Sequence, residues 1–93
     1  MFESLHDLAP AEIEEAAAGL QAGAQTAVLV DPSGVYVVFE PCPNYEVDFT
    51  CAMQDADGNW KPTPLTPLQF GVIHEWVKRL VPALCSTWRK LDE

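Results

Sequence analysis

Three cysteines and two histidines are the residues of this chain best suited to metal or nucleophilic chemistry. Zinc sites usually take paired ligands from short motifs such as Cys-x-x-Cys. Here Cys42 and Cys51 stand nine residues apart, and His6, His74 and Cys85 are isolated in the sequence. Cys85 and His74 would lie about 16 Å apart along a straight helix, too far for a catalytic dyad. We therefore expect no metal site and no enzyme activity based on these side chains.

Two short segments begin like metal-binding motifs and then depart from them. Residues 74–78 start as the His-Glu-x-x-His helix of zinc proteases, but Lys78 occupies the position of the second histidine. Residues 55–59 have the alternating acids of a calcium loop, but Gly58 would be fourth rather than sixth, and no Glu stands at the twelfth position. A turn between two strands is the simpler interpretation of residues 55–59. No cofactor is expected.

The cysteines are expected to be structural thiols. An odd number of cysteines does not indicate a disulfide framework. Cys51 and Cys85 fall on apolar positions of a predicted strand and a predicted helix, so we expect both to be buried and unbonded. Cys42 stands between Pro41 and Pro43 in a predicted loop and is expected to be the accessible thiol.

Acidic residues are numerous and unevenly distributed. The 93 residues include 14 acidic and 5 basic side chains, which give a net charge of −9, and 48% of the residues are hydrophobic. This length and composition predict one small acidic folded domain, residues 1–93. The first 60 residues hold eleven Asp and Glu and no Lys or Arg. A field of this sign repels nucleic acids and anionic membranes, so direct binding to either is not expected.

Helix-start signals and apolar periodicity predict two helices. The first begins at Pro10, has acidic residues in its first turn and ends near Gly23. The second begins with a capping box at residues 66–69, and one half of its circumference, which includes Phe70, is apolar. Pro82 costs about 3 kcal/mol inside a helix, so a kink or a break is expected there.

Three strands are predicted between the helices. Residues 26–30 and 35–40 are rich in β-branched side chains and flank a turn that contains Pro and Gly, which is typical of a β-hairpin. Residues 45–54 alternate between apolar and polar side chains, which predicts a strand with one buried face. Residues 60–61 could begin a short edge strand that Pro62 ends.

The expected fold class is α+β, a two-layer sandwich with the element order α-β-β-β-α. An antiparallel three-stranded meander has one face covered by both helices, because each helix has a single apolar stripe. This element order is similar to that of double-stranded-RNA-binding domains. Those domains carry lysines at the start of the last helix, whereas this chain has Thr66, Pro67, Leu68 and Gln69 there, so their activity is not carried over.

The meander leaves one face of the sheet uncovered, and the expected register places several acids on that face. If Tyr45, Val47 and Phe49 face the helices, their antiparallel pairing with Phe39, Val37 and Val35, in that order, keeps Glu40 out of the core. Apolar side chains among carboxylates are typical of an interface. The residues expected at or beside a partner contact, on this face and in the turn that follows it, are Tyr36, Val38, Glu40, Glu46, Asp48, Asp55 and Asp57.

Size and charge together predict a non-enzymatic, acidic protein-binding module. It would dock on the basic, nucleic-acid-binding surface of a partner protein and inhibit that partner. Small acidic proteins with this behaviour include phage and mobile-element inhibitors of host defence, such as anti-CRISPR proteins, and immunity proteins that neutralise nuclease toxins. The alternative is a homo-oligomeric assembly or chaperone-like subunit that uses an apolar strip or the C-terminal helix. Either a monomer or a homodimer fits these hypotheses.

The start of the chain lacks the positive and apolar regions of a signal peptide, and the longest apolar run is only a few residues. We therefore expect a cytoplasmic protein, located in the host cytoplasm if a phage encodes it.

Overall fold

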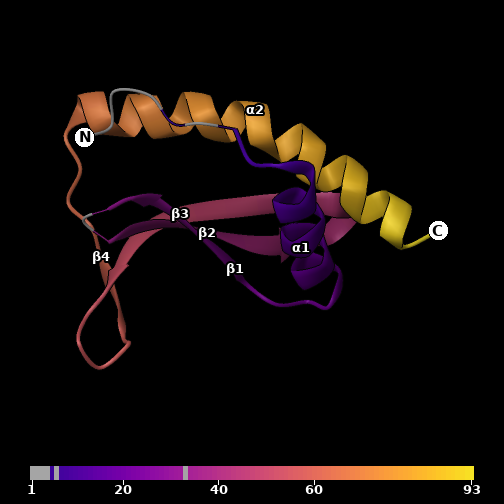
Figure 1. Cartoon of the computed structure of the whole chain (residues 1–93), viewed down its shortest axis with the longest axis horizontal. Coiled ribbons are helices and arrows are strands. Elements are labelled where there is room, and N and C mark those ends of the chain that lie inside the picture. The colour runs from indigo at the N-terminus through magenta and orange to yellow at the C-terminus, as the bar shows by residue number, and fades with distance from the viewer. Residues whose placement is uncertain (1–4, 6, 33) are drawn as a thin grey trace.

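The computed structural model describes residues 5, 7–32 and 34–93. Within these residues two helices and one four-stranded antiparallel sheet form, so the fold class is α+β (Figure 1). The elements in chain order are helix α1 (Pro10–Gln21), strands β1 (Thr26–Asp31) and β2 (Val35–Cys42), a 3-10 turn (Pro43–Tyr45), strands β3 (Glu46–Gln54) and β4 (Trp60–Pro62), and helix α2 (Pro67–Leu91). The strands lie side by side in the order β1-β2-β3-β4.

Both helices begin where the sequence predicted. At the start of α2 the backbone N–H of Gln69 donates to Thr66 Oγ1 (3.2 Å), and Gln69 Oε1 accepts from the backbone N–H of Thr66 (3.0 Å). This reciprocal pair is the expected capping box. At the start of α1 only half of such a box exists, because Ala9 has no side-chain oxygen; Glu12 Oε1 accepts from the Ala9 N–H (3.0 Å).

The faces of β2 and β3 are the expected ones, but their register is shifted by four residues from the expected one, which placed Phe39 opposite Tyr45. Phe39 pairs with Phe49, and the pairs two residues further along join Val37 to Cys51 and Val35 to Met53. On the opposite face Glu40 pairs with Asp48. The apolar alternation of residues 45–54 was therefore sufficient to set which side chains of β3 face the helices.

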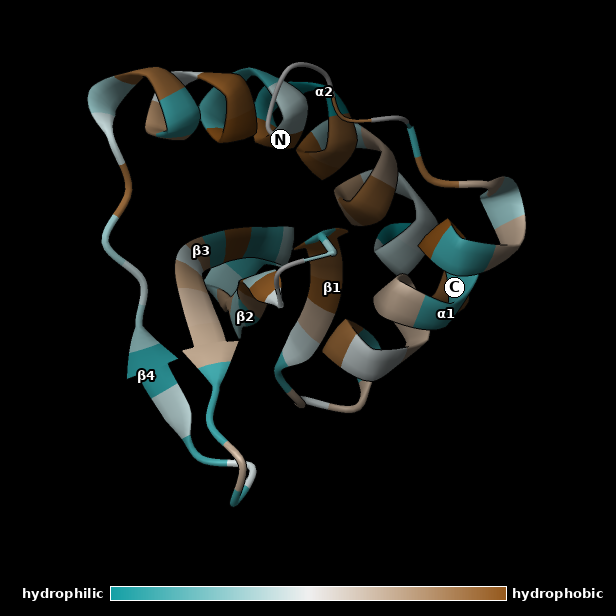
Figure 2. Ribbon diagram, turned by 60° about the vertical axis from the view of Figure 1, so that its left-hand side comes forward, coloured by the Kyte–Doolittle hydropathy of each residue, from teal (hydrophilic) through white to brown (hydrophobic). Residues whose placement is uncertain are grey.

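The core lies between the sheet and the two helices, which cover the same face of the sheet. Figure 2 shows α2 lying across the strands and α1 beside β1. The largest fully buried side chains come from all three parts of the fold: Leu20, Val37, Phe39, Ile73 and Leu84. The packing between α1 and β1 is close, because a Cβ added to Gly19 would lie 2.7 Å from Thr26 Oγ1. A larger residue at position 19 would require either the Thr26 side chain or α1 to shift.

Three expectations need correction. The sheet has four strands rather than three, because the short edge strand that the sequence left open at residues 60–61 pairs with the end of β3. The second helix is not broken at Pro82, since α2 continues through it over 25 residues; a kink there stays a prediction. Phe70 is 49% exposed and stacks on His74 (ring centroids 6.1 Å apart). These two residues are four positions apart and share the outer side of the helix.

The start of β3 also differs from the expectation, because Tyr45 belongs to the preceding turn. Asn44 and Tyr45 both have left-handed backbones, with φ of 66° and 59°. Such a conformation is strained for a bulky residue. The Tyr45 ring packs edge-on against Trp88 (centroids 5.2 Å apart) and beneath the Arg89 guanidinium (5.3 Å). These contacts fasten the turn to the end of α2 and retain the inward position expected for Tyr45.

Candidate functional site

The face of the sheet opposite the helices is the candidate site, and we call it the open face. Side chains alternate between the two faces along each strand, so the register assigns each residue to one of them. The open face consists of Ala27, Leu29, Tyr36, Val38, Glu40, Cys42, Glu46, Asp48, Thr50, Ala52, Gln54, Trp60 and Pro62. Five of the seven predicted site residues are among them. None of these side chains is basic.

One end of the open face is acidic. Glu40 and Asp48 lie directly opposite each other on neighbouring strands, and Cys42 is paired with Glu46 one step further along. Like charges that face each other across a strand pair destabilise a sheet. The side-chain amide of Gln25 donates a hydrogen bond to Glu40. Loss of hydration raises the pKa of the Cys42 thiol, and the neighbouring carboxylates of Asp48 and Glu40 raise it further. The thiol of Cys42 is therefore protonated at neutral pH.

Glu46 lies at the rim between the open face and the helix layer. Burial raises the pKa of the Cys85 thiol on α2; Arg89 opposes this rise and the charge of Glu46 adds to it. Glu46 is thus close enough to α2 for its charge to contribute to the raised pKa of Cys85. The acidic pair at the centre of this end consists of Glu40 and Asp48, with Glu46 beside it.

The other end of the open face is apolar and crosses the whole sheet. Leu29, Tyr36, Ala52 and Pro62 are paired in one row through all four strands. The ring of Trp60 meets that of Tyr36 edge-to-face, with centroids 5.3 Å apart and planes at 86°. This geometry is favourable for aromatic pairs. We call this group of five residues the apolar row.

The structure changes which apolar side chains are available to a partner. Val38 is only 7% exposed although no helix covers it, because it lies in a central strand between the cross-strand neighbours Ala27 and Thr50. Leu29 is 53% exposed and Trp60 is 42% exposed. Sequence reasoning missed both. Continuing the alternation of faces from β2 to β1 would have placed Leu29 on the open face. Pairing residues 60–62 with the end of β3, through a turn at residues 55–59, would have placed Trp60 there.

The two remaining predicted residues, Asp55 and Asp57, lie apart from the acidic end, in the turn between β3 and β4. Asp55 Oδ1 accepts hydrogen bonds from the backbone N–H groups of Asp57 (2.9 Å) and Asn59 (3.0 Å), and Lys61 Nζ lies 3.4 Å from its other oxygen. The hydrogen bond from Asn59 is the main cause that holds the pKa of Asp55 below its usual value. Asp55 therefore stabilises its own turn. Asp57 is exposed.

Asp55 is also distant from the acidic end. Seven residues of extended chain separate it from Asp48, a span of about 23 Å. This exceeds the screening length of about 8 Å at physiological ionic strength. The structure places Tyr36, Val38, Glu40, Glu46 and Asp48 on one face of the sheet, with the three acids at one end and Tyr36 at the other, and it leaves the two turn acids outside that face.

The remaining chemistry-bearing residues do not form a second site. In the part of the chain that the structure describes, no three His, Cys, Asp or Glu side chains are arranged to hold a metal ion. His74 is exposed, and His6 lies outside the described residues. All three cysteines are free and half-buried, so the expected contrast between a buried Cys51 or Cys85 and an accessible Cys42 is absent from their exposure.

Within the described residues, neither α1 nor α2 is long and apolar enough to cross a bilayer. Comparison of the chain with protein-family models, with curated proteins and with solved structures finds no match.

Proposed function

We propose that this chain is a non-enzymatic protein-binding module whose open face docks on a basic surface of a partner protein. The observation that carries the proposal is the Glu40–Asp48 pair, two carboxylates directly opposite each other on a face without a basic side chain. Such a pair costs stability in the free protein. A Lys or Arg of a partner placed between the two carboxylates would convert the repulsion into attraction.

The apolar row supports a protein partner rather than a simple counter-ion. Leu29 and Trp60 offer exposed apolar surface on the same face as the carboxylates, and the half-buried ring of Tyr36 packs against Trp60. Binding energy at protein interfaces concentrates on central aromatic side chains, while charges at the rim mainly accelerate association and set specificity. We assign the first role to Tyr36, Trp60 and Leu29, and the second to Glu40, Glu46 and Asp48.

The partner that fits this face is a basic, nucleic-acid-binding protein, with the carboxylates taking the place of phosphates. The module would act as an inhibitor, as phage or mobile-element anti-defence proteins and toxin immunity proteins do, in the cytoplasm where such partners work. Asp55 and Asp57 would contact the partner only if its surface reaches past the apolar row to the β3–β4 turn.

A second candidate function rests on the apolar row alone. Two copies could bury Leu29 and Trp60 against each other in a homo-oligomeric or chaperone-like assembly. The two candidates respond to salt in opposite ways. Association with a basic partner weakens as salt screens the attraction, whereas self-association of a chain with a net charge of −9 strengthens.

The test starts from a partner recovered by cross-linking in cells that express this chain. Association should slow markedly from about 0.05 M to 0.5 M salt, as the Debye length falls from roughly 14 to 4 Å. Glu46→Lys with Asp48→Lys should weaken binding while the protein stays folded. Glu14→Lys with Glu93→Lys changes the net charge equally at exposed positions that do not belong to the open face and is the matched control. If binding changes neither with salt nor in the Glu46→Lys with Asp48→Lys variant, the acidic end of the open face is not the contact.

A further inference from the structure

The two edges of the sheet are built differently, and only one is protected against strand addition. β4 forms one edge; it is three residues long and contains Lys61 and Pro62. Short length, lysine and proline are features that prevent an edge from pairing with another chain. β1 forms the other edge over six residues, and residues 26–30 contain no charge and no proline. Within residues 5, 7–32 and 34–93 no strand pairs with the outer side of β1, which leaves that side able to accept one.

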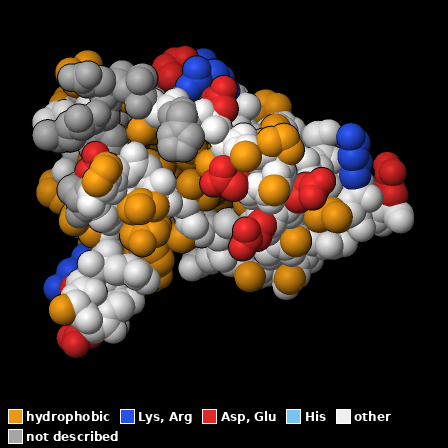
Figure 3. All heavy atoms as spheres, viewed as in Figure 1, with side chains coloured by type: hydrophobic (Ala, Val, Ile, Leu, Met, Phe, Trp, Pro, Cys, Tyr) orange, Lys and Arg blue, Asp and Glu red, His pale blue; other side chains and the backbone are white. Residues whose placement is uncertain are grey.

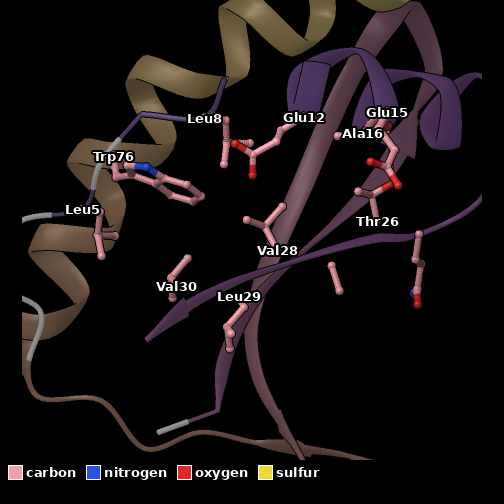
Figure 4. Close-up of a pocket in the computed structure, with 12 residues that line it drawn as sticks. Leu5, Leu8, Glu12, Glu15, Ala16, Thr26, Val28, Leu29, Val30 and Trp76 are labelled. Carbon is pink, nitrogen blue, oxygen red and sulfur yellow. Dashed lines mark hydrogen bonds between the residues drawn. The ribbon is translucent and has the colours of Figure 1, made fainter. Parts of the chain in front are cut away.

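A hollow of about 480 Å³ runs along β1 on the side of the helices (Figure 4). Its lining comes from β1, from α1, from Leu5 and Leu8 before α1, and from Trp76 of α2. Figure 4 shows Leu8, Glu12 and Glu15 on the side of α1 and Val28 pointing from β1 toward them. The outer edge of β1 thus continues into a groove with apolar and acidic walls.

The charge of the groove is negative. Figure 3 shows acidic side chains gathered over α1 and hydrophobic side chains beside them in the region of β1. Glu12 and Glu15 line the groove, three residues apart on one side of α1. In the described part of the chain neither carboxylate has an ion pair with Lys or Arg; Glu12 accepts only the capping hydrogen bond from Ala9. A basic side chain brought in by a ligand would complement both.

We propose that the β1 edge binds an extended segment of a partner protein as a fifth strand, and that this segment alternates apolar and basic side chains. Backbone hydrogen bonds to β1 would supply affinity, and alternate side chains would supply specificity, as in other strand-addition complexes. The basic side chains of the segment point into the groove toward Glu12 and Glu15. The apolar side chains point to the open face beside Leu29. This proposal does not depend on what the open face binds.

A second copy of this chain is the less suitable occupant. Antiparallel pairing of two β1 edges would make one continuous sheet with both α1 helices on the same face, next to each other across the twofold axis. Each α1 turns Glu12 and Glu15 toward the β1 edge, so four carboxylates would approach one another. Charge complementarity selects a basic segment instead.

The probe is a fluorescent seven-residue peptide of alternating Val and Lys, tested against the full chain at 0.15 M salt. Its control is the same peptide with every backbone nitrogen methylated, which keeps all side chains and removes all strand donors. Loss of two or three backbone hydrogen bonds should weaken binding by about tenfold or more. Bound peptide should also slow hydrogen exchange at alternate amides of residues 26–30, because those amides point to the outer edge of β1.

Charge variants test the walls of the groove. Glu12→Gln with Glu15→Gln should weaken peptide binding by about two- to fivefold for each ion pair lost, while Gln at position 12 still caps α1. Glu14→Gln, on the same helix but outside the groove, is the matched control and should have little effect. Glu46→Lys with Asp48→Lys should reduce peptide binding no more than Glu14→Lys with Glu93→Lys does, which separates this site from the open face.

Three results would overturn the proposal. Equal binding of the methylated peptide would show that charge alone attracts the probe. Exchange protection outside residues 26–30 would place the site elsewhere. A concentration-dependent dimer in sedimentation, with these amides already protected in the absence of peptide, would show that a second copy occupies the edge.

Discussion

The two faces of the sheet are made from the same strands but differ in what determines their residues. Along β3, Val47, Phe49 and Cys51 pack against the helices, while Glu46 and Asp48 point to the open face. Packing constrains the first set, because a buried side chain must fill a fixed volume. No such constraint requires Asp48 to stand opposite Glu40. Stability therefore constrains the residues of the covered face, whereas binding is the role that we propose for the open face.

The largest effect is expected on the covered face. Leu84 of α2 is fully buried, so Leu84→Ala should lower the free energy of unfolding by about 2–5 kcal/mol, through lost burial and the cavity left behind. Urea unfolding measures this change. Leu68, on the same helix, is 80% exposed, and Leu68→Ala should change stability by no more than about 0.5 kcal/mol. Equal losses at the two positions would contradict the burial described for α2.

A smaller effect is expected at the apolar row. Tyr36 and Trp60 meet edge-to-face, and such a pair is worth about 0.5–1.5 kcal/mol beyond its area burial. A double-mutant cycle with Tyr36→Leu and Trp60→Leu, measured by urea unfolding, should return a coupling energy in that range. A coupling energy near zero would mean that the two rings do not stabilise each other. Backbone hydrogen bonds to β3 would then be what holds β4 in the sheet.

A still smaller effect, of opposite sign, is expected at the acidic end. Asp48→Asn removes the like-charge pair with Glu40 and should raise the free energy of unfolding by about 0.2–1 kcal/mol. Glu14→Gln is the control for loss of one charge on an exposed helix position. If Asp48→Asn instead lowers the free energy of unfolding, the Asp48 carboxylate stabilises the fold. The proposal that the Glu40–Asp48 repulsion destabilises the unbound protein would then be wrong.

The same substitution should change the reactivity of Cys42. The thiolate is the reactive form, so a thiol with a raised pKa is labelled slowly at neutral pH and faster as the pH rises. Asp48→Asn removes one cause of the raised pKa of Cys42 and should speed its labelling at pH 7–8. Cys51, whose pKa is raised by burial alone, should be labelled at an unchanged rate. Equal acceleration at both thiols would instead indicate loosening of the whole sheet.

The smallest effect concerns the β3–β4 turn. The pKa of Asp55 is lower in the folded protein than its usual value of 3.8, so its charged form stabilises the fold. This contribution is complete above about pH 4 and is lost as the pH falls through the lower, folded-state pKa. In Asp55→Asn the decline of the melting temperature on acidification from pH 5 should be shallower than in the wild type. Identical pH profiles would show that the charged form of Asp55 does not stabilise the turn.

Alternation and helix-start signals were sufficient for most of the fold. The pattern of residues 45–54 predicted which face of β3 is buried, and Thr66 with Gln69 predicted the start of α2. Parity assigns a side chain to a face but does not say how far its neighbours cover it. For this reason Val38 was expected at the contact and is buried, while Leu29 was not expected there and is exposed.

The groove beside β1 was beyond sequence reasoning for a related reason. Glu12 and Glu15 read as the solvated side of a helix, and only the tertiary position of α1 turns them toward β1. The hydrogen bonds of the β3–β4 turn explain a second difference: they allow residues 60–62 to return along β3 despite two nearby prolines. The groove depends on contacts between distant segments, whereas the turn depends on hydrogen bonds within residues 55–59.

The unequal edges of the sheet also limit how far this molecule could polymerise. Fibre growth by strand addition needs a receptive edge on each side of every subunit, so that each added chain presents a new template. Here β1 can accept a strand, but Lys61 and Pro62 on β4 obstruct the next step. Addition at β1 ends after one event, whichever chain supplies the strand. A small domain can in this way keep one edge available for recognition without becoming a seed for amyloid.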